Sequence, residues 1–443
     1  MRLNTASAIK KIHTHEGAPA ARINTMQALR RSVCSSFLWE NSFYEDGVSI
    51  TDRIVSLANE VDVESLGKLA VELRTEENLR HMPLLLTSVM AKRGAGNPLV
   101  ADTVAAVVRR PDEMGELLSI HALLNSVGPD GLKKVLPAQM KKGLARAFAR
   151  FDGYQLAKYD RDGPIRLRDV MFLSHPKPAD AAQKEIWEQL INGTLAAPDT
   201  WEVALSGGAD KREAFTRLLS EGKLGYMALL RNLRNMVEAG VDEGLIRDAI
   251  LARKGAGNVL PFRFTAAARA CPRMEAALDE ALCERIHEMP ALSGKTIVLV
   301  DVSYSMRGNL SRKSDLTRMD AAATLASIIH GDLRVITFSR KNVEVPARRG
   351  MAGVDTIINS QEHSGTNLGE AVALANKQPH DRLIVITDEQ ARSPVPDPVA
   401  SKAYMINVAN EKNGVGYGRW THIDGFSENV LRFISAHEEM ADG

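Results

Sequence analysis

The hydrophobic pattern of the 443-residue chain changes at Pro290. Between about residue 20 and residue 288, apolar residues recur at three- and four-residue spacing, and short breaks of Gly, Pro or Asp separate the segments. This pattern predicts a succession of helices with almost no strands. From residue 295 onward, short runs that are apolar throughout alternate with helical segments, which is typical of a doubly wound sheet of buried parallel strands. We therefore expect a helical domain over residues 1–290 and an α/β domain over residues 291–443.

The clearest individual elements follow the same division. In the first part, the predicted helices cover residues 64–73, 82–93, 138–151, 223–240 and 243–255. In the second part, the predicted strands cover residues 295–301, 333–339, 382–389 and 402–409, with helices over 318–331 and 367–377. Two similar stretches, AKRGAGNPL at 91–99 and ARKGAGNVL at 252–260, place glycine after a basic last turn, which predicts a helix end. Their similarity is consistent with a stacked helical repeat and equally with coincidence.

Composition excludes several classes of protein. The net charge is +1, so nucleic-acid binding would depend on local basic patches and not on an overall positive field. The three cysteines form no CxxC pair, which fits inert thiols in a reducing compartment. The first thirty residues lack the apolar core of a signal peptide, and no apolar run reaches the roughly 18 residues of a membrane-spanning helix. We therefore expect a cytoplasmic protein without membrane association.

Polar side chains follow two of the predicted strands and precede one of the predicted helices. Asp301, Ser303 and Ser305 come directly after the first strand in DVSYSM, Thr366 precedes a helix in HSGTN, and Asp388 ends the strand RLIVITD. Ligands of open parallel sheets bind beyond the carboxyl ends of the strands, so these side chains are expected to lie together. An aspartyl phosphatase would need a second aspartate where Ser303 stands, and a serine hydrolase would need flanking glycines. Neither hydrolytic mechanism fits.

The same five side chains suit a hard divalent cation. Mg²⁺ prefers octahedral oxygen ligands, accepts hydroxyls with one or two carboxylates, and retains several waters. The pattern resembles the metal-ion-dependent adhesion site of von Willebrand factor A domains, in which DxSxS is followed by a Thr and then an Asp. The resemblance implies Asp301, Ser303, Ser305, Thr366 and Asp388 as ligands of Mg²⁺ or another divalent cation, with one position open to an outside ligand. The alternative is that Ser303 and Thr366 only cap helices.

Two segments of the helical part are candidates for RNA binding. In LAKYDRDGPIRLRDVMFLSHPKP, residues 156–178, basic residues are interleaved with Tyr159 and Phe172, a combination that can hold phosphates and stack on bases. Segment 131–151 contains six basic residues and no acidic one, and every fourth position of one predicted helix face is basic. On composition alone a solvated helix and loop is the favoured explanation of the first segment, and a solvent-facing stripe explains the second equally well.

The order of motifs resembles the Ro autoantigen family, whose helical part is called the TROVE module. The motifs are FLWENSFYEDG at 37–47, the KY…LSHPKP stretch at 158–178 and KLGYMALLRNLRNM at 223–236, all ahead of the von Willebrand A-like segment. The sequence FLWENSFYEDG is most similar to that of bacterial and phage members. The resemblance implies a monomeric ring of HEAT-like helical repeats that is closed by the doubly wound, Rossmann-like α/β domain.

For such a ring, the resemblance implies that single-stranded 3′ ends of misfolded or precursor non-coding RNA enter the central hole, while Y-like RNA binds outside. A ring admits only an unpaired strand, and basic side chains neutralise phosphates without reading sequence. Lys158 and His175 match RNA-contact positions of the family, whereas Asp160 and Asp162 replace residues that are basic in some members. The full set of expected RNA-binding residues is Lys158, Arg161, Arg168, His175 and Lys177, with Lys142, Arg146 and Arg150.

The expected function is therefore RNA quality control or processing within a ribonucleoprotein, with a 3′ exonuclease such as polynucleotide phosphorylase as a candidate partner. The alternative is a protein–protein adaptor that works through a Mg²⁺-dependent A domain. We do not expect an enzyme, because the helical part offers no nucleophile–base pair and no nuclease-like acidic cluster. His13 and His15 in HTHEG lack further metal ligands nearby, and we expect them in a flexible terminus.

Overall fold

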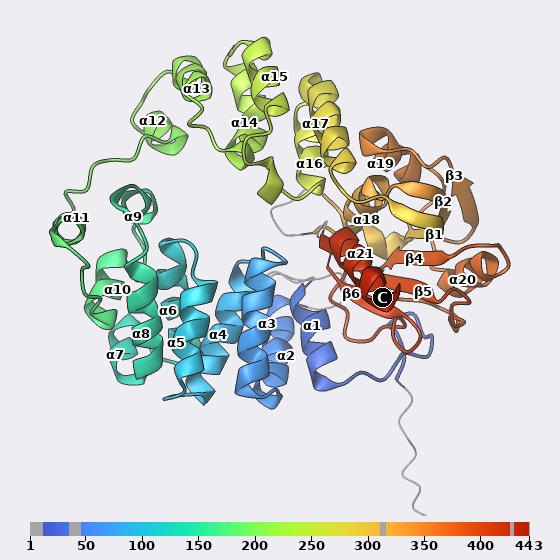
Figure 1. Cartoon of the computed structure of the whole chain (residues 1–443), viewed down its shortest axis with the longest axis horizontal. Coiled ribbons are helices and arrows are strands. Elements are labelled where there is room, and N and C mark those ends of the chain that lie inside the picture. Colours follow the sequence, from blue (N-terminus) through green and yellow to red (C-terminus); the bar gives the residue numbers. More distant parts are fainter. Residues whose placement is uncertain (1–11, 35–45, 311–315, 426–428, 443) are drawn as a thin grey trace, which may run out of the picture. The chain divides into compact units, whose positions relative to one another are not determined.

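The computed structural model describes residues 12–34, 46–310, 316–425 and 429–442 (Figure 1). Residues 37–45 of the FLWENSFYEDG motif lie outside these ranges. The chain divides into two compact units: residues 51–246, here called the helical unit, and residues 1–50 together with 247–443, here called the α/β unit. The expected class, mainly helical with a doubly wound α/β domain toward the C-terminal end, is confirmed.

The helical unit consists of short helices joined by tight turns. The helices are α3 (Val63–Thr75), α4 (His81–Arg93), α5 (Pro98–Val107), α6 (Asp112–Leu124), α7 (Leu132–Val135), α8 (Ala138–Phe148), α9 (Gly153–Tyr159), α10 (Leu167–Ser174), α11 (Ala181–Asn192), α12 (Trp201–Ser206), α13 (Lys211–Ser220) and α14 (Tyr226–Glu238). At the limits of the unit lie α2 (Gly47–Glu60) and α15 (Glu243–Leu251). All five helices expected in this part form, although α8, α14 and α15 are shorter than predicted.

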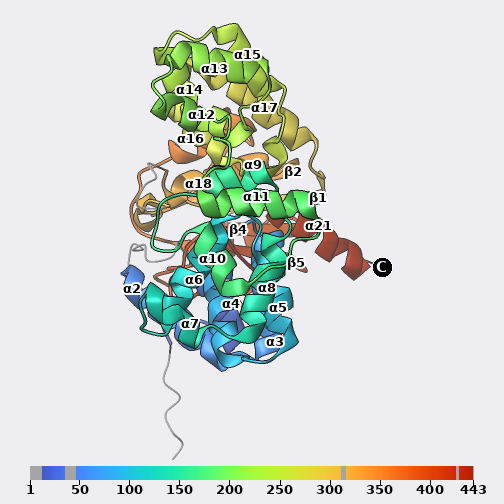
Figure 2. The ribbon, with the colours of Figure 1, turned by 90° about the vertical axis from the view of Figure 1, so that its left-hand side faces the viewer.

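The helices from α3 to α8 stand side by side (Figures 1 and 2). α3 packs against α4 and α5, α4 against α6, and α5 against α8. The ten residues Met82–Ala91 of α4 are all buried, which explains why this helix is apolar on several faces. Gly143 of α8 lies so close to α5 that an added Cβ would be 2.6 Å from Val104 Cβ and 2.7 Å from the carbonyl oxygen of Ala101. Glycine therefore permits the close approach of α8 to α5.

The predicted helix end fits the first GAGN stretch, since α4 ends at Arg93 with a basic last turn and Gly94 follows directly. It fits the second only in part, because α15 already ends at Leu251 and has no basic residue in its last turn. The backbones of the two stretches also differ. Gly94 of the first stretch has a φ of −97°, whereas the equivalent Gly255 of the second has a φ of +85° and is followed by a 3-10 turn. The similarity in sequence does not extend to the backbone, and repeat ancestry stays a hypothesis.

The α/β unit contains a sheet with the strand order β3-β2-β1-β4-β5-β6. β1 pairs in parallel with β2 and β4, β4 with β5, and β5 with β6, whereas β2 and β3 are antiparallel. The strands are β1 (Leu292–Asp301), β2 (Gly331–Phe338), β3 (Asn342–Val345), β4 (Arg382–Thr387), β5 (Lys402–Asn407) and β6 (Thr421–Asp424). The helices that accompany them are α18 (Arg318–Ile328), α19 (Gly350–Ile358), α20 (Leu368–Asn376) and α21 (Asn429–Asp442).

The four predicted strands correspond to β1, β2, β4 and β5. All six residues of β4 are buried, as expected for a central parallel strand. The sequence did not predict β3 or β6, which have four residues each and lie at the two ends of the strand order. Strands this short and half-exposed leave no clear hydrophobic pattern.

Segments from outside residues 291–443 complete the α/β unit. α1 (Thr25–Cys34) packs against β6, α16 (Phe262–Ala270) against α18, and α17 (Glu275–His287) against α19. Arg269 of α16 forms an ion pair with Asp320 of α18 at 2.6 Å. The two compact units are defined by packing contacts. The domain boundary expected after residue 290 was based on the change in hydrophobic pattern, and it stays a prediction.

The expectation that the HTHEG segment belongs to a flexible terminus is wrong. Thr14 Oγ1 donates to the carbonyl oxygen of Ala391 at 2.7 Å, and the His15 N–H donates to Gln390 Oε1 at 2.7 Å. Ala18 belongs to the buried core of the sheet. Because these contacts span more than 370 residues of sequence, no local pattern could have predicted them.

Candidate functional site

The predicted metal-site residues lie on loops at one edge of the sheet. Asp301 ends β1, Ser303 and Ser305 follow it, and Asp388 directly follows the neighbouring parallel strand β4. Asp301 Oδ1 accepts a hydrogen bond from the Ser303 N–H at 2.9 Å, and Asp301 Oδ2 accepts one from Thr387 Oγ1 at 2.6 Å. The hydroxyl oxygens of Ser303 and Ser305 are 3.3 Å apart. The hydroxyls and carboxylates are therefore held by backbone geometry and by one another.

The loop before α20 reaches the same edge of the sheet. The Tyr304 N–H donates to the carbonyl oxygen of Ser364 at 2.9 Å, and the His363 ring nitrogen Nδ1 lies 2.9 Å from the carbonyl oxygen of Val302. Thr366, two residues after Ser364, is buried. The structure thus places all five predicted ligands on loops that contact one another or follow adjacent strands.

Helix capping does not explain these residues. Ser303 precedes a 3-10 turn at Tyr304–Arg307 but makes no side-chain capping hydrogen bond there. The N-cap of α20 is Asn367 and not Thr366, and its side chain also makes no capping hydrogen bond. Helix capping is therefore wrong as the role of Ser303 and Thr366.

The two carboxylates of the site, Asp301 and Asp388, are fully buried. Burial raises the pKa of Asp301 to about 6. The pKa of Asp388 is raised to about 7, chiefly by burial and then by the negative charges of Asp301 and Glu411. Asp388 Oδ1 accepts from the Gln390 N–H at 3.1 Å, but its buried Oδ2 has no hydrogen-bond partner in the described structure. A cation at this position would relieve both the charge repulsion and the unpaired oxygen.

The five predicted side chains at the sheet edge offer oxygen donors only. Among the described residues, no group of three or more His, Cys, Asp or Glu side chains could hold a metal. A cation at the sheet edge would therefore depend on the hydroxyl oxygens as well as on the two carboxylates. Oxygen donors of this kind suit Mg²⁺ and similar ions, and they do not suit thiophilic metals.

A buried ion-pair cluster directly follows Asp388. Glu389 Oε1 lies 3.0 Å from Arg31 Nη1, and it also pairs with the ring of His422 on β6. Burial alone would raise the pKa of Glu389, but the positive charges of Arg31 and His422 hold it well below its usual range. Because Arg31 comes from α1, the N-terminal helix fixes the loop that carries Asp388. No local pattern in the sequence indicated that Arg31 would be buried.

Lys158, the principal RNA-binding candidate, lies in the last turn of α9 in the helical unit. Its Nζ atom is 5.9 Å from the ring centroid of Tyr154 and 5.8 Å from that of Tyr159. Tyr154 is exposed, and Lys158 and Tyr159 are half-buried. A cation beside accessible aromatic rings is the combination that the sequence predicted for phosphate and base contacts.

The two aspartates that depart from the family pattern do not neutralise Lys158. Arg166 Nη2 lies 3.4 Å from Asp160 Oδ2, and Arg166 Nη1 lies 3.3 Å from Asp162 Oδ1. Within the described residues, neither Lys158 nor Arg161 has an acidic partner. The negative charges of Asp160 and Asp162 are therefore paired with Arg166 in the same loop.

The remaining candidates of segment 156–178 are exposed. Arg168 lies 4.0 Å from Asp169, at the outer limit of an ion pair. His175 ends α10 in the left-handed conformation, with a φ of 49°, and its N–H donates to the carbonyl oxygen of Met171 at 2.9 Å. No hydrogen bond or ion pair in the described part of the chain joins Lys158 to His175 or to Lys177.

The basic side chains predicted for one face of α8 differ in whether an acidic residue neutralises them. Arg146 forms an ion pair with Asp102 of α5 at 2.6 Å, so its charge is already neutralised. Arg150, just beyond α8, donates from Nη2 to the carbonyl oxygen of Val108 at 2.7 Å and has no acidic partner among the described residues. Lys142 is exposed. Of the three, Arg150 is the side chain that tertiary contacts hold in place without neutralising it.

Comparison with known proteins decides the family. The sequence matches the TROVE domain over residues 5–197 and 193–288. The chain belongs to the TROVE family. It is 24% identical over 390 residues to telomerase protein component 1 of Mus musculus, and 22% identical over 309 residues to that of Rattus norvegicus. These matches cover 67% and 51% of this TROVE chain but only 14% and 12% of the lengths of the two relatives.

The fold of the TROVE chain is similar to that of the Deinococcus radiodurans Ro (RSR) protein. The TM-score is 0.61 at 17% sequence identity, and the match covers 94% of this chain and 99% of the other. At this identity the similarity shows a shared fold. Membership of the TROVE family indicates an RNA-binding ribonucleoprotein component. None of the described helices has both the length and the apolar character needed to cross a membrane.

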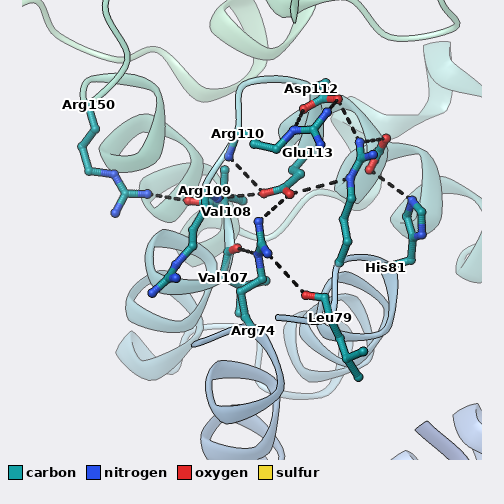
Figure 3. Close-up of polar contacts among 12 residues, drawn as sticks. Arg74, Leu79, His81, Val107, Val108, Arg109, Arg110, Asp112, Glu113 and Arg150 are labelled. Carbon is teal, nitrogen blue, oxygen red and sulfur yellow. Dashed lines mark hydrogen bonds and ion pairs between the residues drawn. The ribbon is translucent and has the colours of Figure 1, made fainter. Parts of the chain in front are cut away.

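Sequence reasoning missed two arginines of the TROVE chain, in the loop between α5 and α6. The Arg110 guanidinium carbon lies 4.6 Å from the ring centroid of Tyr159, so this loop contacts the end of α9. The neighbouring Arg109 is exposed and points away from the carboxylates of the loop (Figure 3). In the sequence, the two arginines stand in the stretch RRPDE at 109–113. The two acidic residues that follow them made this stretch resemble an ordinary turn without net charge.

Proposed function

We propose that this TROVE chain captures single-stranded 3′ ends of misfolded or precursor non-coding RNA and also binds Y-like RNA. In this role it presents RNA for quality control or processing, with a 3′ exonuclease such as polynucleotide phosphorylase as a partner. The supporting observation is the positive charge of Lys158 close to two tyrosine rings, with Asp160 and Asp162 paired with Arg166. A surface of this kind suits phosphates and unpaired bases without reading sequence.

The experiment compares one structured RNA with and without a single-stranded 3′ tail. Fluorescence anisotropy over a series of KCl concentrations is expected to show tighter binding of the tailed RNA, and a linear fall of log K with log salt. Lys158→Gln should weaken binding and reduce the salt slope by about 0.7 for a single-stranded contact. Lys68→Gln is the matched control, because Lys68 is an exposed lysine already paired with Glu64 at 2.8 Å.

Two results would contradict this function. Equal affinity for tailed and blunt RNA at physiological salt would reject capture of 3′ ends. Identical binding by Lys158→Gln and the control variant would reject the basic and aromatic surface at the end of α9 as an RNA contact.

We further propose that the sheet-edge site holds Mg²⁺ or a similar ion. Asp301, Ser303, Ser305, Thr366 and Asp388 would supply the oxygen ligands, and the ion would bridge to an acidic group of a partner protein. The observation that favours this second, adaptor-like function is the unpaired buried Oδ2 of Asp388. The two proposals are compatible, because the metal-site residues lie in the α/β unit and Lys158 lies in the helical unit.

Thermal unfolding with and without Mg²⁺ tests the metal site. The wild-type midpoint should rise with Mg²⁺, by a stabilisation of about 2.7 kcal/mol at a hundred times the dissociation constant. Asp388→Asn should abolish this response, whereas Asp397→Asn, which removes an exposed carboxylate of the same unit, should keep it. A wild-type midpoint that does not respond to Mg²⁺, Mn²⁺ or Ca²⁺ would reject a cation site.

Chelation separates the adaptor function from RNA capture. If the sheet-edge site recruits a partner, EDTA and Asp301→Ala should abolish co-purification of that partner while the RNA affinity stays unchanged. Loss of RNA binding on chelation would argue against the assignment of the two functions to separate units.

A further inference from the structure

A buried ion pair fixes the loop between α5 and α6. Glu113 is fully buried, and its Oε1 accepts a hydrogen bond from Arg74 Nη2 at 2.6 Å. Its Oε2 accepts from the backbone N–H groups of Arg109 at 2.8 Å and Arg110 at 3.0 Å. Arg74 Nε also donates to the carbonyl oxygen of Val107 at 3.0 Å (Figure 3). Charge-assisted bonds therefore hold the backbone of this loop from both sides.

Arg109 and Arg150 project on the same side of this loop. In Figure 3 their guanidinium groups lie on one side of the loop backbone, whereas Asp112 and Glu113 lie on the other. The Arg150 bond to the carbonyl oxygen of Val108 anchors Arg150 beside the residue that precedes Arg109. A cavity of about 480 Å³ opens here, lined by Thr75, Ala106, Val108, Arg109, Arg150 and Phe151. Its volume is within the range of about 300–1,000 Å³ that is usual for small-ligand sites.

The cavity carries uncompensated positive charge. None of the described residues that line it is acidic. Burial lowers the pKa of Arg150, and the facing charge of Arg109 lowers it further. The acidic residues of the loop are already engaged, since Asp112 pairs with Arg110 at 2.6 Å and Glu113 makes the contacts given above. Two guanidinium groups without an acid between them favour an anion as the missing partner.

The cavity also adjoins the predicted RNA surface. The loop residue next to Arg109 is Arg110, whose guanidinium stacks over the ring of Tyr159 at 4.6 Å. The same ring lies 5.8 Å from Lys158 Nζ. A short series of direct contacts therefore joins the Arg109–Arg150 cavity to the end of α9.

We propose that Arg109 and Arg150 form a two-pronged site for a backbone phosphate of the bound RNA. Planar guanidinium groups match the oxygens of a phosphodiester, and a phosphate here would extend the RNA path from Lys158 along the α5–α6 loop. This inference rests on the proposed function, because it assumes that RNA reaches the helical unit. It adds Arg109, and it separates Arg150 from Arg146, which Asp102 already neutralises.

A double-mutant cycle with the tailed RNA tests this site. Arg109→Gln and Arg150→Gln should each weaken binding roughly tenfold, as expected for the loss of a charge-assisted hydrogen bond. Their double variant should lose little more than either single variant, because both side chains hold one phosphate. Arg146→Gln is the control from the same helix face; it should bind almost like wild type and be additive with Arg150→Gln.

The possible outcomes separate this site from the proposed function. If wild type binds tailed RNA but Arg109→Gln and Arg150→Gln behave like Arg146→Gln, the phosphate site is rejected and RNA capture stands. If wild type binds no RNA, both the phosphate site and the proposed RNA capture fail.

A second experiment, with inorganic phosphate, distinguishes the source of the anion. A rise in the unfolding midpoint with phosphate that these variants lose, combined with unchanged RNA affinity, would assign the cavity to a free phosphate and reject the RNA contact.

Discussion

The buried carboxylate of Glu113 is expected to be a main determinant of stability in the helical unit. It accepts three hydrogen bonds, from Arg74 at 2.6 Å and from the backbone N–H groups of Arg109 and Arg110 at 2.8 and 3.0 Å. In Glu113→Gln the amide keeps the shape, but its single oxygen can serve only one side, and its NH₂ group then faces donors. Breaking a buried pair on one side costs about 3–5 kcal/mol, and we expect a loss of this size in the free energy of unfolding.

Hydrogen exchange measured by mass spectrometry reports this loss locally. A change of 3–5 kcal/mol corresponds to roughly a hundredfold to several-thousandfold faster exchange in the protected amides of α3 and α6, at about 1.4 kcal/mol per factor of ten. Glu64→Gln is the matched control, because it removes the same charge from an exposed i,i+4 pair on α3, with Glu64 62% exposed. That change should cost at most about 0.5 kcal/mol.

An acceleration in Glu113→Gln of less than about fivefold, equivalent to roughly 1 kcal/mol, would refute this reasoning. It would mean that water or a shifted Arg74 replaces the lost bonds, and that the loop is less rigid than its hydrogen bonds indicate. Fast exchange in Glu113→Gln together with unchanged RNA affinity would separate the stability of the loop from its role in presenting Arg109.

Two further predictions concern the helical unit. Gly143→Ala should destabilise it by about 1–3 kcal/mol in urea denaturation despite the better helix propensity of Ala, because the new Cβ would lie 2.6 Å from Val104 Cβ. Gly153→Ala, where the nearest atoms are 3.5 Å away, should be neutral or stabilising, and equal effects of the two changes would contradict the close contact of α5 and α8. Burial lowers the pKa of His121, so the folded unit holds it neutral while the unfolded chain takes up a proton near pH 6.5. The stability it contributes is present above that pH and should fall below it by at most about 1.4 kcal/mol per pH unit; urea denaturation at several pH values should show a shallower fall in His121→Gln, and identical pH profiles would exclude His121 as the cause.

The agreement between sequence and structure is greatest where a local pattern has a local cause. Continuous apolar runs predicted β1 and β4 because strands buried on both faces need apolar side chains at every position. The DxSxS motif predicted side chains at the edge of the sheet because parallel strands end together there. Short, half-exposed β6 had no such pattern, although it completes the site's surroundings by placing His422 against Glu389.

Charge is where sequence and structure differ most. On sequence alone Arg146 and Arg150 were equivalent members of one helix face, and Asp160 and Asp162 counted against Lys158. The structure neutralises Arg146 with Asp102 from another helix and uses Arg166 to hold the aspartates. Ion pairs between separate elements depend on distances of a few ångströms that no spacing along the chain encodes.

The sequence by itself determined the fold class and the family, and it predicted which oxygen-bearing side chains lie at the sheet edge, because hydrophobic period and motif order are properties of the chain. Only the tertiary structure decided which charges are free. It buried Arg31 against Glu389 and paired Arg146, and it left Arg109 and Arg150 together beside a cavity without an acid. The physical reason is that the effect of a charge depends on its neighbours in space, which come from helices and strands far apart along the chain.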